Sequence, residues 1–278
     1  MVNVTTSDIL TEERIRRVVE DETQEVLVWN EAFREINMPE DWSSDTMEIP
    51  IDVGIMGEPE RIQEGSEFPR AEENYDTIPI TVKKYGMEVS VAWESTLFSV
   101  FDIVAQQIEK KSRRMAEKLN RLAFEVISDP NNLHPNGPVT GSGSIDYPTI
   151  TDARKELLDD QKDPDMLIVN TAGENQLLNS EAFQRATELG DETVLDGAIG
   201  RIAGIDVMVD NSGLLDPSTG QGIMVDSDDY GYEVIKQEVA TEEYEAPERQ
   251  ADIFQIYTMR EWEAIKPEAA IKVEEGTA

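Results

Sequence analysis

The sequence predicts a mixed α+β fold, and three features of its patterning indicate it. Residues 101–127 carry apolar side chains at helical spacing over their whole length. Residues 46–93 contain long segments of alternating character around a polar loop, which is typical of strands. After residue 149, short helical and alternating segments follow one another to the end of the chain. This mixture of periods is the pattern of helices and sheets packed together in one protein.

The composition is strongly acidic. The 278 residues include 59 Asp and Glu against 24 Lys and Arg, which gives a formal net charge of −35. Self-repulsion of this size destabilises a compact state at ordinary ionic strength. In molar salt the screening length falls to about 3 Å, and the repulsion is largely removed. We therefore expect a protein that works in concentrated salt, because its long periodic apolar segments argue against a disordered acidic chain.

The composition also excludes several classes of protein. The chain has no cysteine, so it forms no disulfide and offers no thiolate ligand or nucleophile. No segment has the length of a membrane-spanning helix or the apolar core of a signal peptide, so no membrane partner is expected. The length allows one large domain or two modest ones. Because the whole chain would repel duplex DNA, any contact with nucleic acid must be local.

Residues 6–36 are predicted to form a helix that Ser7 or Asp8 caps and that ends before Pro39. Its apolar positions are Ile15, Val18, Val19, Val26, Trp29, Phe33 and Ile36. A helical segment with aromatic residues of its own packs either on this chain or on a neighbour.

The next predicted feature is a long arm. Residues 46–56 and 77–93 alternate as strands, and the polar residues 57–76 between them contain glycines and prolines. Two strands joined by so large a loop are too thin to bury both faces, so an arm of this kind leans on another subunit.

Residues 101–127 are predicted as the strongest helix in the chain. One face is apolar, with Val104, Ile108, Met115, Leu119, Leu122 and Val126. A second stripe is basic, with Lys110, Arg114, Lys118 and Arg121, and the segment from Lys110 to Arg121 holds six basic residues and one acid. Two interpretations stand: a solvated face paired with acids such as Glu117 and Glu125, or a sequence-independent contact with phosphates.

The rest of the chain alternates between short elements. Residues 129–148 form a loop or hairpin rich in Pro, Asn and Gly that marks a change of domain. The elements expected after it are a helix at 151–160, a strand at 166–169, helices within 172–188, paired strands within 193–211, a strand at 223–225 and several strands within 232–273.

No segment contains a convincing set of catalytic, cofactor-binding or metal-binding residues. The single histidine, His134, lies in a Pro/Asn loop without an adjacent nucleophile, which predicts a solvated surface residue. Asp226 to Gly231 resembles a calcium loop faintly, but Tyr230 and Gln237 occupy two ligand positions, so a hydrated acidic turn is the better interpretation. Gly197, Gly200 and Gly204 match no phosphate-binding fingerprint. We expect no enzyme and no cofactor.

Three segments, taken in order, resemble the major capsid proteins of tailed double-stranded DNA viruses, which have the Hong Kong 97-type fold. They are ITVKKYGMEVSVAWESTLFSVFDIVAQQIEKKSRRMAEKLNRLAFEVI, LDGAIGRIAGIDVMVDN and REWEAIKPEAAIKVE. The resemblance covers about residues 7–273 and lies in the order of the parts, since no single motif is specific. Together with the acidic composition, it implies a virus of a salt-loving archaeal host.

The resemblance implies a division of the chain. Residues 1–45 would be the N-terminal arm, 46–93 the E-loop, 94–148 a peripheral domain with the spine helix, 149–231 the axial domain, and 232–278 the closing strands of the peripheral domain. The E-loop tip would contact a neighbouring subunit through Arg61, Ile62, Phe68, Pro69, Arg70 and Tyr75, with Phe68 as the apolar anchor.

The function that the resemblance implies is self-assembly into hexamers and pentamers of an icosahedral shell around double-stranded DNA, in a virion assembled in the host cytoplasm. The basic stripe would face the DNA. A portal and a separate scaffold or decoration protein are expected as partners, because the predicted arm begins almost at Met1. Residues 57–76 contain no lysine, so cross-linking of the shell by isopeptide bonds is not expected.

Two other functions fit the same sequence. An encapsulin-like cellular compartment shares the fold and encloses enzymes instead of a genome, and a neighbouring terminase, portal, peroxidase or ferritin-like gene would separate it from a virus. A soluble halophilic α+β enzyme is the third possibility, and it would not sediment as a megadalton particle.

Overall fold

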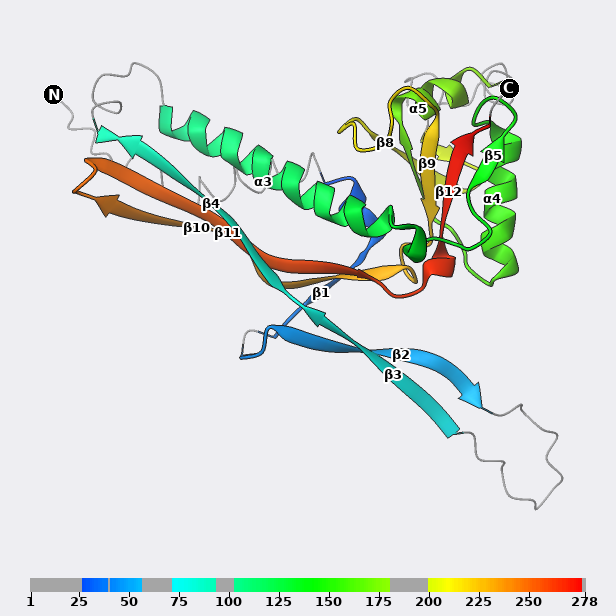
Figure 1. Cartoon of the computed structure of the whole chain (residues 1–278), viewed down its shortest axis with the longest axis horizontal. Helices are drawn as coiled ribbons and strands as arrows, with labels where there is room; N and C mark the ends of the chain where they lie inside the picture. Colours follow the sequence, from blue (N-terminus) through cyan, green and yellow to red (C-terminus); the bar gives the residue numbers. More distant parts are fainter. Residues whose placement is uncertain (1–26, 40, 57–71, 94–102, 181–199, 277–278) are drawn as a thin grey trace.

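The computed structural model describes residues 27–39, 41–56, 72–93, 103–180 and 200–276. Its strands form a four-stranded sheet, a six-stranded sheet and a separate two-stranded sheet. Figure 1 shows the four-stranded sheet with a long helix above it, the six-stranded sheet at one end of the molecule, and the two-stranded sheet projecting from the body. The predicted α+β class is confirmed.

The four-stranded sheet is long and is covered on one face by one helix. Its strands in spatial order are β1 (Arg34–Asn37), β10 (Gly231–Ala246), β11 (Ala251–Ala264) and β4 (Lys83–Ala92). β1 runs parallel to β10, and the other neighbours are antiparallel. Helix α3 (Ile103–Ile127) buries Met115, Leu119 and Ala123 in the same core as Phe254 and Trp262 of β11. The helical period of residues 101–127 therefore predicted this element correctly.

The six-stranded sheet forms a second core with helices α4 (Tyr147–Asp159) and α5 (Thr171–Leu178). Its strands in spatial order are β5 (Val139–Gly141), β12 (Ala270–Glu275), β9 (Gln221–Val225), β6 (Met166–Asn170), β8 (Ile205–Asp210) and β7 (Arg201–Ile202). All five residues of β6 are buried. This burial explains why the segment is apolar without alternation.

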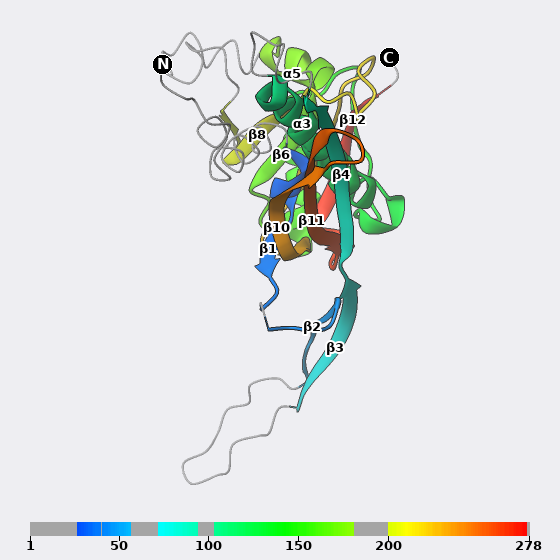
Figure 2. The same cartoon turned by 90° about the vertical axis from the view of Figure 1, so that its left-hand side faces the viewer.

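The two-stranded sheet consists of β2 (Thr46–Met56) and β3 (Glu72–Thr81), paired antiparallel. Figures 1 and 2 show it extending away from both larger sheets. At its base, Ile49, Ile80 and Val82 pack with Met38 and with Val234 of β10 in a small core. The expected arm of two long strands is present, although the returning strand is divided: β3 ends at Thr81 and β4 joins the four-stranded sheet.

The prediction of a helix over residues 6–36 is wrong where the structure describes it. Trp29–Ala32 form a short 3₁₀ helix, η2, and β1 follows directly. Phe33 already has extended backbone angles, because the next residues pair with β10. The apolar spacing of Trp29, Phe33 and Ile36 arises from one tight turn followed by a strand. Residues 6–26 of that prediction lie outside the described residues.

The other boundaries differ by a few residues. Helix α4 begins at Tyr147 instead of 151, because Asp146 caps it by accepting a hydrogen bond from the Thr149 amide at 3.1 Å and Pro148 fits its first turn. The Pro-rich loop before it contains the 3₁₀ helix η3 (Pro130–Asn132) and strand β5. A third 3₁₀ helix, η4 (Pro267–Ala269), precedes β12.

Candidate interaction surfaces

The basic stripe on α3 is exposed along its whole length. Lys110, Arg114, Lys118 and Arg121 are all solvent-exposed, and they alternate with positions that are buried against the sheet. The orientation of the helix is fixed at its C-terminal half, where the Trp29 amide donates to Asn120 Oδ1 at 3.0 Å. The Trp29 and Phe124 rings also pack edge to face, with centroids 4.9 Å apart. These contacts hold the basic stripe on the outward face of the helix.

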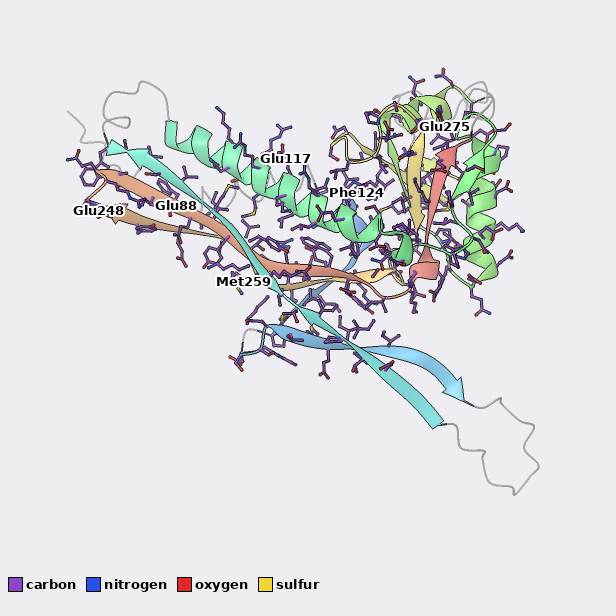
Figure 3. All side chains as sticks on the ribbon, in the orientation of Figure 1. Glu88, Glu117, Phe124, Glu248, Met259 and Glu275 are labelled. Carbon is purple, nitrogen blue, oxygen red and sulfur yellow. The ribbon has the colours of Figure 1, made fainter. Side chains whose placement is uncertain are left out.

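The acids near this stripe do not neutralise it. Glu117, labelled in Figure 3, is within 3.8 Å of Arg113, a cation outside the stripe. Among the described residues, no carboxylate lies within 4.0 Å of the four stripe cations. The sequence left open whether Glu117 and Glu125 pair with these cations, and the structure shows that they do not. Within the part of the chain that the structure describes, these four cations therefore have no acidic partner, on a protein of net charge −35.

The arm of β2 and β3 has a buried base and an open outer part. At the base, the Thr46 and Thr81 hydroxyls are hydrogen-bonded at 2.9 Å, and Lys236 of β10 forms an ion pair with Asp45. Further out, Asp76, Thr77 and Pro79 are exposed, and the register shifts between Asp52 and Ile55. A shift of this kind bends and twists a strand pair.

One of the six predicted contact residues of the arm tip falls within the part of the chain that the structure describes. This residue is Tyr75, which lies in β3 and pairs with Asp52 of β2. The other five, Arg61, Ile62, Phe68, Pro69 and Arg70, lie outside the described residues. The anchor role of Phe68 remains a prediction.

The acidic turn at Asp226–Asp229 differs from its prediction as a hydrated loop. Asp226 is buried and accepts a hydrogen bond from the Asp163 amide at 2.9 Å. Asp229 binds Lys162 at 2.8 Å and Lys266 at 3.0 Å, so two lysines occupy the place of a cation. The hydrogen bond from Lys162 holds the pKa of Asp229 below its usual range, whereas burial raises the pKa of Asp226.

This turn is a joint between the two large sheets. It links β9 of the six-stranded sheet to β10 of the four-stranded sheet. The second crossing runs beside it, from β11 to β12, and is joined to it by hydrogen bonds from the Ile265 amide to the Tyr230 carbonyl at 2.8 Å and from the Asp226 amide to the Ala269 carbonyl at 2.9 Å. These backbone hydrogen bonds and the ion pair of Asp229 with Lys266 hold the two crossing segments together.

His134 is also part of this joint, and its prediction as a solvated residue is wrong. The side chain is 3% exposed. Its Nδ1 accepts from the Asn136 amide at 3.2 Å, so Nε2 carries the proton and donates to Asp160 at 2.8 Å. The His134 amide in turn donates to the Ala270 carbonyl at 2.7 Å. The ring therefore ties the loop after α3 to the end of α4.

A buried charged pair that the sequence interpretation missed lies under the four-stranded sheet. Arg260 Nη1 is 2.7 Å from Glu233 Oε1, and both side chains are less than 9% exposed. Burial raises the pKa of Glu233 even though Arg260 opposes the shift. The signal was present in β11, where every second residue from Phe254 to Ala264 is buried, which places Arg260 on the inward face.

Among the described residues, no group of three or more His, Asp or Glu side chains is arranged to hold a metal ion. In the same part of the chain, no helix is long and apolar enough to cross a membrane.

Comparison with known proteins gives one family. The family described as phage capsid protein matches residues 74–273, which is most of the chain. No curated protein matches.

Several solved structures share the fold. The capsid of cyanophage P-SCSP1u has a TM-score of 0.68 at 11% identity, with 91% of this chain and 89% of that chain covered. The mature capsid of bacteriophage PhiM1 gives 0.65 at 12% identity over 90% and 87%. A virus-like particle from Pyrococcus furiosus gives 0.59 at 13% identity over 94% and 98%. The long helix on a four-stranded sheet, the projecting arm and the six-stranded sheet form the Hong Kong 97-type fold, and the chain belongs to the phage capsid protein family.

Proposed function

We propose that this chain is the major capsid protein of a tailed virus and that it assembles into the hexamers and pentamers of an icosahedral shell. The observation that carries the proposal is the arm of β2 and β3. Its base is packed on its own subunit through Ile49 and Ile80, whereas Asp76, Thr77 and Pro79 further along β3 are exposed. A two-stranded sheet is at best marginally stable alone in water, so the arm requires support from another subunit.

The division of the chain follows from this function. Residues 46–93 act as the E-loop, 94–148 and 232–278 as the peripheral domain, 149–231 as the axial domain that meets its copies around the symmetry axes, and 1–45 as the N-terminal arm. The polar joint at Asp226–Asp229 lies where the peripheral and axial domains meet. No step of this function is catalytic.

Packaged double-stranded DNA is the nucleic-acid partner in this proposal. The stripe Lys110, Arg114, Lys118 and Arg121 supports it, because exposed cations without acidic partners bind phosphates independently of sequence. A portal and a separate scaffold or decoration protein complete the virion, which is assembled in the host cytoplasm.

The medium in this proposal is concentrated salt, and the host is a salt-loving archaeon. The net charge of −35 per subunit supports it, since many copies packed edge to edge repel one another strongly in dilute buffer. The shell is held without covalent links, because residues 57–76 of the arm contain no lysine.

An encapsulin-like compartment is the second candidate. The structural similarity to the virus-like particle from Pyrococcus furiosus supports a shell of this fold without deciding what it encloses. The content of the particle separates the two functions.

The test is electron microscopy and sedimentation of the full chain, expressed with its neighbouring genes and purified in molar salt. Megadalton icosahedral particles that protect DNA from nuclease are the expected result. Particles that contain an enzyme and no DNA would establish the compartment, and a protein that sediments as a single 31.2 kDa chain under all salt conditions would reject both shells.

A further inference from the structure

The arm of β2 and β3 is joined to the rest of the subunit, its body, at a narrow base. The two strands enter through Asp45, directly before β2, and through Val82, which separates β3 from β4. The Val82 amide donates to the Asp45 carbonyl at 2.8 Å, so the two entry points are tied to each other. Figures 1 and 2 show the arm projecting from the four-stranded sheet at this point. A base this narrow can act as a pivot.

Apolar packing at the base does not by itself set the direction of the arm. Ile49 and Ile80 of the arm share a small core with Val234 of β10, and the partly buried Ile36 and Tyr232 pack against it. Apolar contact is stabilising but non-directional, so these side chains can stay in contact while the arm rotates by a modest angle. A single direction requires a contact with its own preferred geometry, such as a hydrogen bond.

Lys236 of β10 makes such a contact. Its ammonium donates to the Ser44 carbonyl at 3.1 Å and also to Asp45 Oδ1, so it holds two consecutive residues at the start of the arm. The Lys236 side chain is 23% exposed, whereas that of Asp45 is 60% exposed. The lysine is therefore largely enclosed, and its hydrogen bond to the carboxylate is of the strong, charge-assisted kind.

A β-bulge explains why a lysine of β10 reaches the arm. Ile235 pairs with Arg260 and Gln237 pairs with Met259, the adjacent residue of β11, so Lys236 is the extra residue between them. A bulge interrupts the alternation of side chains and re-aims the extra one. The bulge begins where β1 ends, because the last residue of β1 pairs with Ile235. The sheet thus directs Lys236 at the segment in which the chain turns from β1 into the arm.

We propose that Lys236 is a clamp that fixes the direction of the arm in the free subunit through its joint hold on Ser44 and Asp45. Loss of the clamp leaves the strand pairing and the core of the arm in place but lets the arm rotate about its base. The clamp is a property of the single chain. Its consequence rests on the proposed function, because an arm that is already aimed loses less conformational freedom when it contacts a neighbouring subunit.

Distances between pairs of spin labels measure the direction of the arm, and the natural chain has no cysteine to interfere with labelling. One sample carries Thr77→Cys in the arm and Ser90→Cys in β4, and a second carries Ser90→Cys and Ser218→Cys, both in the body. All three positions are exposed. Thr77 lies five residues from Val82 (82 − 77), a lever of about 16 Å, so rotation at the base changes the arm-to-body distance. The full chain is measured in molar salt, below the concentration at which it assembles.

The clamp is removed by Lys236→Gln. The matched control is Lys272→Gln, because Lys272 pairs with Glu274 at 2.9 Å, has 32% of its side chain exposed and lies in β12 of the six-stranded sheet. Lys236→Arg keeps a donor for both acceptors and serves as the rescue. Asp45→Ala removes one acceptor without a change in β10, so it tests the clamp even if Lys236→Gln disturbs the sheet. Circular dichroism checks that each variant folds.

We expect Lys236→Gln to widen the distribution of arm-to-body distances about two-fold, because a directional contact is lost. Asp45→Ala should widen it less, Lys236→Arg should restore the narrow distribution, and the distance within the body should stay unchanged in all variants. A distribution that stays narrow in Lys236→Gln would overturn the proposal, as would equal widening in Lys272→Gln. Widening of both distances would assign Lys236 to the stability of the body and overturn it as well.

These outcomes are separate from the test of the shell. A chain that never assembles into particles but shows the expected widening would reject the proposed function and support the clamp. A chain that forms particles while Lys236→Gln leaves the arm distance unchanged would support the shell and reject the clamp.

Discussion

At the residue scale, Asp229 is the clearest case of a carboxylate that two lysines hold in the place of a bound cation. Lys162 is 11% exposed and Lys266 is 31% exposed, and both donate to this one carboxylate. The sequence predicted a hydrated acidic turn with only a faint resemblance to a calcium loop, because the local pattern showed the acids and not the lysines. The two lysines come from segments 67 and 37 residues away in either direction (229 − 162 and 266 − 229), so local sequence could not reveal them.

We expect Asp229→Asn to destabilise the subunit by about 1–3 kcal/mol, because Lys162 stays buried with a weaker acceptor. Asp228→Asn is the matched control, since Asp228 is exposed, and we expect its effect to stay within about 0.5 kcal/mol. Urea unfolding in molar salt measures both. Equal stabilities for the two variants would show that the joint does not depend on this carboxylate.

The effect of Asp229→Asn should depend on pH. The folded-state pKa of Asp229 lies below its value in the unfolded chain because Lys162 and then Lys266 stabilise the carboxylate. The stabilisation is therefore present above the unfolded pKa of about 3.9 and is lost as the pH falls through the folded-state pKa. The difference between the natural chain and the variant should shrink in acid, and a difference that grows below pH ~4 would reverse this assignment.

The buried ion pair of Arg260 and Glu233 gives another prediction at the residue scale. Arg260→Ala leaves a buried carboxylate with Asn30 as its remaining side-chain donor, and we expect a loss of about 3–5 kcal/mol. Replacement of both residues by Met and Leu removes the charges together and should cost far less. Urea unfolding of the natural chain, the single variant and the double variant measures these losses of stability. Equal losses for the two variants would contradict the prediction.

At the scale of elements, the sequence predicted helix α3 and strand β11 because each has one buried face. The period of Met115 and Leu119 on α3 and the alternation of β11 follow directly from that burial. The helix prediction around Trp29 was wrong because Trp29 is buried from a single turn against Phe124, 95 residues further on (124 − 29), whereas Phe33 packs on Tyr230. These long-range contacts produce helical spacing by coincidence. The prediction of His134 as a solvated residue was wrong for a related reason, because the fold brings its partner Asp160 to it.

The basic stripe of α3 gives a prediction for this element. The variant Lys110→Gln, Arg114→Gln, Lys118→Gln, Arg121→Gln should fold normally, because all four side chains are exposed and make no ion pair among the described residues. Its affinity for duplex DNA should fall, and the logarithmic salt slope of binding should decrease by up to about 0.9 for each phosphate that the variant no longer neutralises.

The control for the stripe variant removes Lys155 and Arg249, exposed cations on α4 and after β10. Binding is measured by fluorescence anisotropy over a range of salt concentrations. The control removes two charges and the stripe variant four, so an equal decrease in binding free energy per removed charge would mean that only the net charge matters.

At the scale of the whole molecule, the negative charge of the surface opposes the compact fold. Most described cations already have acidic partners, including Lys83 with Glu261, Lys155 with Asp159 and Lys236 with Asp45. The excess of 35 negative charges is therefore carried by acids without a basic partner and is spread over the surface. In the proposed shell, every boundary brings together two copies that each carry this net negative charge, so the repulsion recurs at every boundary between subunits.

We expect assembled particles to swell or dissociate when the salt is lowered from molar to about 0.1 M, because the screening length rises from about 3 Å to about 10 Å. The subunit itself should hold its fold longer than the shell, since its larger core joins buried residues of both large sheets within one chain. Light scattering follows the particle and circular dichroism follows the fold during the same dialysis. A chelator is included throughout, so that divalent cations cannot replace the screening by salt. Particles that keep their size in dilute buffer under these conditions would show that interactions between subunits, such as those of the arm, outweigh the repulsion of 35 net charges per chain.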